Sequence, residues 1–98
     1  MNQSHDFVER SLEVRNLIAT SDLAAAIRKA MDLVKDFSGR EDLDEVTVYS
    51  MTLREIEGAH RREELKFDEV VDRKKKLARQ VLGLLGAIES QLLEPAAA

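Results

Sequence analysis

The sequence predicts an all-α protein, and three observations support this fold class. Apolar residues recur at steps of three and four in four successive segments, which is the spacing of one helix face. Short turn-forming stretches separate the segments, and the only proline, Pro95, ends the last of them. A chain of 98 residues suits one domain. We therefore expect a single domain over residues 1–93, folded as an up-down antiparallel four-helix bundle. The alternative is a six-helix arrangement like the death fold.

The first two helices are expected at residues 6–19 and 22–37. Ser21 is the expected N-cap of the second helix, with Asp22 behind it, and Gly39 is expected to end that helix in a left-handed conformation. The face of the first helix consists of Phe7, Ser11, Val14 and Ile18, and Val8, Leu12 and Leu17 widen it. The face of the second consists of Leu23, Ile27, Ala30, Met31, Val34 and Phe37.

The third helix is expected to begin in the acidic segment at residues 41–45, because acidic side chains suit the positive end of a helix. The segment VTVY alone resembles a strand, but the flanking helical pattern and strong helix formers favour a helix. The apolar face of this helix consists of Leu43, Val46, Tyr49, Leu53 and Ile56.

The fourth helix, Phe67–Leu93, is the longest and would run roughly 40 Å. The other three segments must pack along it, since no other part of the chain can cover it alone. Its apolar face consists of Phe67, Val70, Leu77, Val81, Leu84, Leu85, Ile88 and Leu92.

The boundary between the third and fourth helices has no proline or glycine between residues 61 and 68, so a continuous helix over residues 41–94 is the alternative. Polar residues Glu57, His60 and Glu64 nevertheless occupy the positions that would continue the apolar face. We therefore expect an antiparallel hairpin with a turn near residues 63–67, in which Leu65 and Phe67 fold inward.

A charged block surrounds this predicted hairpin turn. Between Arg54 and Lys76, 15 of 23 residues are Asp, Glu, Lys or Arg. The first two helices are too short to cover the end of a hairpin whose helices run roughly 33 and 40 Å. We expect that end to project into solvent, where charges need no desolvation.

The composition argues against several classes of function. The chain has no cysteine, which excludes disulfides and thiolate zinc sites and suits a cytoplasmic protein. The net charge of −4 and an aromatic content of 4% argue against nucleic-acid binding. No apolar run approaches the ~20 residues of a membrane span, and the first residues lack the features of a signal peptide.

No residues combine into a recognisable catalytic or cofactor site. His60 and Glu64 are four residues apart and could form one edge of a metal site, but no second His or Cys is placed to complete it. Ser11, Ser50 and Ser90 have no histidine partner at a readable spacing. We expect a protein that is not an enzyme and needs no cofactor, metal or small-molecule substrate.

Small residues form a strip on the fourth helix at Gly83, Gly86, Ala87 and Ser90. The strip is expected to pack closely against the alanines of the second helix. The alternative is a groove that admits a helix of another protein.

Two clusters of opposite charge are the candidate interaction sites. Solvated helix faces with partners such as Glu69 and Asp72 are the simpler interpretation of the basic run, and a docking patch for an acidic partner is the functional one. In an antiparallel hairpin the clusters lie roughly 25–30 Å apart along the axis, so they could neutralise each other only between copies. The acidic candidates are Glu41, Asp42, Asp44 and Glu45, and the basic candidates are Arg61, Arg62, Arg73, Lys74, Lys75 and Lys76.

Three segments, at residues 17–27, 53–70 and 77–88, together resemble a known family: the small helical effector-associated domains of bacterial conflict systems, specifically the eleventh type. The family pattern begins L-I-x-x-G-x-L-x-x-A-I. The matching residues are Leu17, Ile18, Leu23, Ala26 and Ile27 in this part, Arg61, Leu65, Phe67, Asp68 and Glu69 around the turn, and Leu77, Val81, Leu82 and Leu84 in the last helix.

The chain departs from that pattern at four positions. Ser21 and Glu63 stand where the family has glycine, Lys66 where it has a Ser or Thr cap, and Lys75 where it has Asn. The resemblance implies an adaptor domain that sits beside a protease, TIR-type or NTPase effector and pairs with similar domains on other proteins.

The expected function is therefore non-enzymatic, like-with-like recruitment of an effector in a bacterial immune or signalling system, with self-association as one form of pairing. The alternatives are a structural coiled-coil dimerisation protein and a regulatory subunit of an enzyme. Residues 94–98 are expected to form a tail or the start of a linker.

Overall fold

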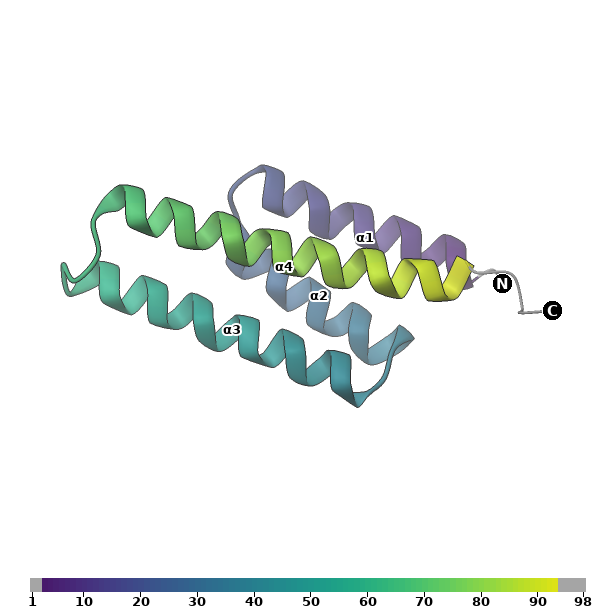
Figure 1. Cartoon of the computed structure of the whole chain (residues 1–98). Coiled ribbons are helices and arrows are strands. Elements are labelled where there is room, and N and C mark those ends of the chain that lie inside the picture. Colours follow the sequence, from purple (N-terminus) through teal and green to yellow (C-terminus); the bar gives the residue numbers. More distant parts are fainter. Residues whose placement is uncertain (1–2, 94–98) are drawn as a thin grey trace.

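The computed structural model describes residues 3–93, and these form four α-helices and no strand (Figure 1). The helices are α1 (Gln3–Ala19), α2 (Leu23–Phe37), α3 (Arg40–Arg61) and α4 (Phe67–Leu93). The predicted all-α class is confirmed. The tail predicted at residues 94–98 lies outside the described residues.

The turn between α1 and α2 differs from its prediction by one residue. Ser21 is not the N-cap: its φ is 63°, in the left-handed region, and its backbone N–H donates to the Ile18 carbonyl. The backbone N–H of Asp22 donates to the Leu17 carbonyl at 2.8 Å, which completes a Schellman ending of α1. The Asp22 side chain then accepts the backbone N–H of Ala25 at 3.2 Å and is the N-cap of α2.

The corner between α2 and α3 also corrects an expectation. Gly39 was expected in the left-handed region, but its φ of −97° and ψ of −177° are extended, and it is the N-cap of α3. Ser38 is the C-cap of α2, and its hydroxyl donates to the Asp42 carboxylate in the first turn of α3. One serine therefore joins the two helix ends.

The predicted turn between α3 and α4 is confirmed, because α3 ends at Arg61 and α4 begins at Phe67. Glu63 has a φ of 61° and donates its backbone N–H to the His60 carbonyl, while Glu64 donates to the Ala59 carbonyl, another Schellman ending. At the start of α4, the Glu69 carboxylate accepts the backbone N–H of Lys66 at 3.2 Å, which is half of a capping box. A continuous helix over residues 41–94 is thus not what the chain forms.

The core follows the predicted helix faces with a few differences. All the faces contribute buried residues, and Ser11 is buried with Phe7 and Val14 as the first-helix pattern predicts. Leu33, which the second-helix face omitted, is fully buried. Phe7 packs edge-on against Phe37 with 5.5 Å between ring centroids, at the end of α1 and α2 opposite their turn.

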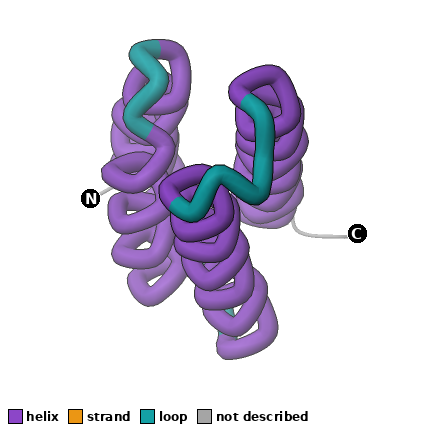
Figure 2. Tube along the Cα trace, turned by 90° about the vertical axis from the view of Figure 1, so that its left-hand side faces the viewer, coloured by secondary structure: helices purple, strands orange, loops and turns teal. Residues whose placement is uncertain are grey.

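The α3–α4 hairpin projects beyond the α1–α2 turn, as its helix lengths predict (Figure 1). The molecule measures 53 × 25 × 20 Å, and Figure 2 shows it from the hairpin end. The projecting end carries the charged block, so most of its side chains are exposed, while Ile56 and Val70 remain buried between the two helices. Two helices alone hold this end of the molecule.

Candidate protein-interaction surfaces

The predicted acidic cluster lies at the start of α3, at the end of the hairpin away from its turn (Figure 1). Two of its four carboxylates are already engaged. Asp42 accepts the Ser38 hydroxyl, and Glu45 accepts a hydrogen bond from the Tyr49 hydroxyl one turn later. Glu41 and Asp44 are exposed and form no ion pair within residues 3–93. These two carboxylates are available to a partner.

The acidic cluster affects the ionisation of the Tyr49 phenol. Its burial, the hydrogen bond to Glu45 and the negative charges of Glu45 and Asp42 together raise the pKa of the Tyr49 phenol to about 12. The phenol therefore stays protonated throughout the physiological range. Its hydroxyl holds the Glu45 carboxylate along the helix, whereas Glu41 and Asp44 form no ion pair within the described residues.

The basic run, residues 73–76, lies in the first half of α4, and its four side chains are on two different sides of that helix. Arg73 and Lys76, three residues apart, line a groove on the side facing α3. Lys74 and Lys75 line a different groove, on the side facing the α1–α2 turn. None of the four forms an ion pair within the described residues, so the partners expected at Glu69 and Asp72 do not engage them there.

Arg61 and Arg62 at the end of α3 have different surroundings. Arg62 donates to both carboxylate oxygens of Glu64, at 2.7 and 3.3 Å, and this ion pair lowers the pKa of Glu64. The Arg62 side chain also lies over Gly58, whose Cβ, if present, would be 3.1 Å from the guanidinium. Arg61 is exposed. The structure thus places Arg62 beside Arg73 and Lys76, and the other predicted basic residues elsewhere.

The groove facing α3 has a volume of about 940 Å³ and is open to solvent. Its walls mix three cations, Arg62, Arg73 and Lys76, with the carboxylates of Glu55 and Glu64. Opposite charges within one groove compensate each other, so it presents no strong field of one sign.

The groove facing the α1–α2 turn has a volume of about 450 Å³ and is mainly apolar. Phe67, which was predicted to fold inward, is instead 72% exposed and forms one wall, while Leu65 is half-buried against the core. The groove exists because α1 and α2 end before they reach the start of α4. It combines an exposed aromatic ring with Lys74 and Lys75; its lining is Ile18, Ser21, Leu23, Phe67, Val71, Lys74, Lys75 and Ala78.

The outward face of α3 carries a feature that the sequence reasoning missed. Val48 and Met51 are 56% and 57% exposed, and Asp44 and Glu55 stand on the same face at each end of them. The signal was present in the sequence, since both apolar residues fall outside the third-helix seam and are three apart. Together these four residues form what we call the α3 strip.

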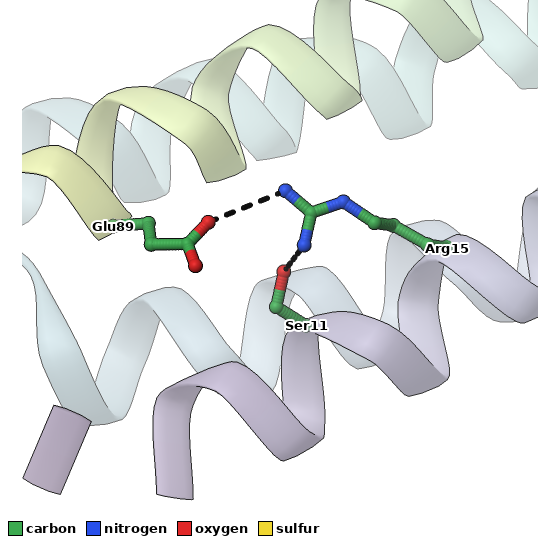
Figure 3. A network of polar contacts seen from close by, with 3 residues as sticks. All are labelled: Ser11, Arg15 and Glu89. Carbon is green, nitrogen blue, oxygen red and sulfur yellow. Dashed lines mark hydrogen bonds and ion pairs between the residues drawn. The ribbon is translucent and has the colours of Figure 1, made fainter. Parts of the chain in front are cut away.

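A polar contact joins α1 to α4 near the opposite end of the molecule (Figure 3). Arg15 donates to the buried Ser11 hydroxyl at 2.6 Å and to the Glu89 carboxylate at 3.5 Å. No buried side-chain nitrogen or oxygen among the described residues lacks a partner. This contact holds two helices together and has the exposure of a structural ion pair, with side chains about one-third exposed.

The small-residue strip of α4 is also a correction. It was expected to pack against the alanines of α2, but Gly83, Ala87 and Ser90 are exposed. A Cβ added at Gly83 or Gly86 would meet no atom within 4 Å. The strip faces solvent because the covered side of α4 is set by its larger apolar residues, such as Val81, Leu85 and Ile88.

The remaining candidate residues, those for a metal site, do not come together with further ligands in the described part of the chain. Within residues 3–93, no three His, Cys, Asp or Glu side chains are placed to share a metal ion, so His60 and Glu64 stay without further ligands there. Among the same residues, no helix combines the length and the apolar character needed to cross a bilayer.

Comparisons with family models, with curated proteins and with solved structures found no match to this chain.

Proposed function

We propose that this chain is a protein-interaction adaptor: an up-down antiparallel four-helix bundle that pairs with a second copy of itself or with a similar helical domain on an effector. Recruitment of that effector, in a bacterial immune or signalling system, is the role that the family resemblance implies. The domain performs no chemistry of its own in this proposal.

The observation that carries the proposal is that lysines and exposed carboxylates lie toward opposite ends of the α3–α4 hairpin, too far apart to pair with each other. Lys74 and Lys75 beside an exposed Phe67 lie toward one end of the α3–α4 hairpin, whereas Glu41 and Asp44 lie at the other. The monomer leaves the Phe67 ring 72% exposed, and neither lysine forms an ion pair within residues 3–93. Such surfaces suit a second protein that brings the opposite charge.

A further observation favours the family resemblance. The two positions at which the family pattern has glycine, occupied here by Ser21 and Glu63, are the two non-glycine residues with positive φ among the described residues. Glycine is the residue that a left-handed helix ending prefers. The position of the family's Ser or Thr cap, Lys66, directly precedes α4, where a cap belongs. These turn positions, one before α2 and two in the turn before α4, are what supports the resemblance in this proposal.

Recognition through these surfaces depends on salt. Exposed charges separated by more than about 10 Å are screened at 0.1 M ionic strength, and the screening length falls to about 3 Å at 1 M. Complementary charges chiefly raise the association rate and select the partner. Pairing should therefore weaken strongly between 50 mM and 500 mM NaCl.

Sedimentation equilibrium at several protein concentrations tests the proposal at both salt concentrations. We expect reversible self-association at 50 mM NaCl that weakens at least about tenfold at 500 mM. The charge-reversed protein Lys74→Glu/Lys75→Glu should associate less, while Arg79→Glu, an exposed position of α4 outside both grooves, should behave like the unchanged protein. A chain that remains monomeric at low salt up to millimolar concentration would overturn like-with-like pairing.

A further inference from the structure

We infer that the α3 strip of one copy docks into the apolar groove beside Phe67 of another copy, so that the domain associates head to tail through two different surfaces. The inference rests on the proposed function and specifies which surfaces pair. It depends on a match between the exposed apolar side chains of two surfaces that do not line one another within the described residues of a single copy.

The α3 strip has the form of a docking helix. Asp44, Val48, Met51 and Glu55 are separated by four, three and four residues, so they lie in one line along α3. Val48 and Met51 are more than half exposed in spite of their apolar side chains. Amphipathic helices bind apolar grooves through apolar residues spaced three or four apart, and the α3 strip has such a pair with a charged residue on each side.

The groove has the complementary form. Phe67 is 72% exposed and, with Ile18 and Val71, supplies apolar walls, while Lys74 and Lys75 supply the charge. Its volume of about 450 Å³ accommodates a few side chains and not a whole helix. Two adjacent apolar side chains from a helix lying over the opening therefore suit it.

The exposed apolar residues of the molecule concentrate on these two surfaces. Four large apolar side chains of the described residues are highly exposed, and three of them, Val48, Met51 and Phe67, belong to the α3 strip or the groove. The fourth, Leu12 on α1, was expected to widen the apolar face of the first helix but is 52% exposed. The charges agree as well, since the strip carries the exposed carboxylate of Asp44 and the groove carries Lys74 and Lys75.

The two surfaces cannot satisfy each other within one copy. The groove is lined by residues of α1, α4 and the start of α2 with the turn before it, and by none of α3. Contact between different surfaces of identical copies is heterologous, and each added copy leaves one strip and one groove open at the two ends. Association of this kind extends into a chain unless the rotation closes a ring.

Complementation between two defective variants tests the pairing. Met51→Asp damages only the strip, and Lys74→Glu/Lys75→Glu damages only the groove. Each protein alone should lose self-association by at least about tenfold. Their mixture retains one intact strip and one intact groove, so it should form a capped 1:1 heterodimer that grows no further, visible by sedimentation velocity and light scattering. Leu12→Asp is the matched apolar-to-acid control and should associate like the unchanged protein.

The outcomes separate the inference from the proposed function. If the unchanged protein associates and Met51→Asp associates equally well, the assigned surfaces are wrong although the adaptor proposal stands. If both variants fail to associate but their mixture yields no heterodimer, the two surfaces do not pair with each other. If the unchanged protein does not associate at all, the inference fails together with the self-pairing form of the proposed function, and pairing with a similar domain on an effector is the form that remains. Circular-dichroism melting of every variant shows that lost association is not lost folding, and Val48→Lys is the replacement for the strip variant if Met51→Asp does not fold.

Discussion

Replacing Glu63 by glycine should stabilise the domain, because this residue holds the left-handed backbone position that ends α3. Its φ is 61°, and its side chain makes no hydrogen bond or ion pair within the described residues. A left-handed conformation costs a residue with a Cβ about 1–2 kcal/mol. Glycine removes that cost but adds about 0.5–1 kcal/mol of backbone entropy to the unfolded state. The net gain is therefore about 0.5–1 kcal/mol.

For a domain of this size, such a gain corresponds to a rise in Tm of roughly 2–8 °C. Thermal and urea unfolding followed by circular dichroism at 222 nm measure it. Glu63→Ala is the matched control, since it deletes the same side chain but keeps the Cβ and should therefore leave stability within about 0.5 kcal/mol of the original. Equal stability of the glycine and alanine variants, or a loss with glycine, would show that the backbone at this turn is not strained.

Three further substitutions or titrations follow from the described contacts. Gly86→Ala should raise stability by about 0.5–1 kcal/mol in urea unfolding, because the position is helical and a Cβ there meets no atom within 4 Å. Absorbance at 295 nm follows Tyr49 alone, as the chain has one tyrosine and no tryptophan, and it should show a pKa near 12 that falls with Glu45→Gln. Since the unfolded phenol ionises near 10, the stability that Tyr49 contributes is complete below pH 10 and is lost as the pH rises from about 10 to 12. Arg15→Met should cost about 1 kcal/mol in unfolding free energy, mostly the bond to the buried serine hydroxyl, and Glu89→Gln should cost less because its contact is 3.5 Å long and partly exposed.

The helix assignments could be predicted because each helix carries its own apolar periodicity. The lapse of that periodicity at Glu57, His60 and Glu64 located the turn before Phe67 without help from proline or glycine. Packing against the core follows the same pattern, so most buried positions were predictable. Leu33 was not predicted to be buried. It stands three residues after the buried Ala30 and therefore lies on the same side of the helix, next to the residues that were predicted.

The turn residues could not be placed from residue type alone. Gly39 was expected to be left-handed because glycine tolerates that conformation, yet Ser21 and Glu63 adopt it and Gly39 is extended. The conformation of a turn is set by where the preceding helix runs out and by the direction in which the next helix must leave. A helix that ends one residue earlier or later moves the left-handed position onto a different residue, and sequence patterns locate helix ends only to within a few residues.

The exposed surfaces were harder to predict than the core, for a related reason. Periodicity says which residues of a helix share a face, but the lengths of its neighbours decide how much of that face is covered. Phe67 continues the apolar face of α4 and is nevertheless exposed, because α1 and α2 do not reach it. The strip at Gly83 and Gly86 was assigned to the core because small residues permit close approach, although no atom of the described residues lies within 4 Å of a Cβ added at either glycine.

The exposed apolar residues of this molecule contribute little to folding and are available for binding another protein. Val48, Met51 and Phe67 are more than half exposed, so the folded state obtains little of the roughly 1.5–3 kcal/mol that fully burying such a side chain can contribute. Their apolar character is therefore not explained by the stability of the monomer, whereas contact with another protein would use it. Because these residues lie outside the core, they can be replaced at small cost to folding. Loss of pairing without loss of stability is consequently the result that distinguishes an interaction surface from an incompletely covered core.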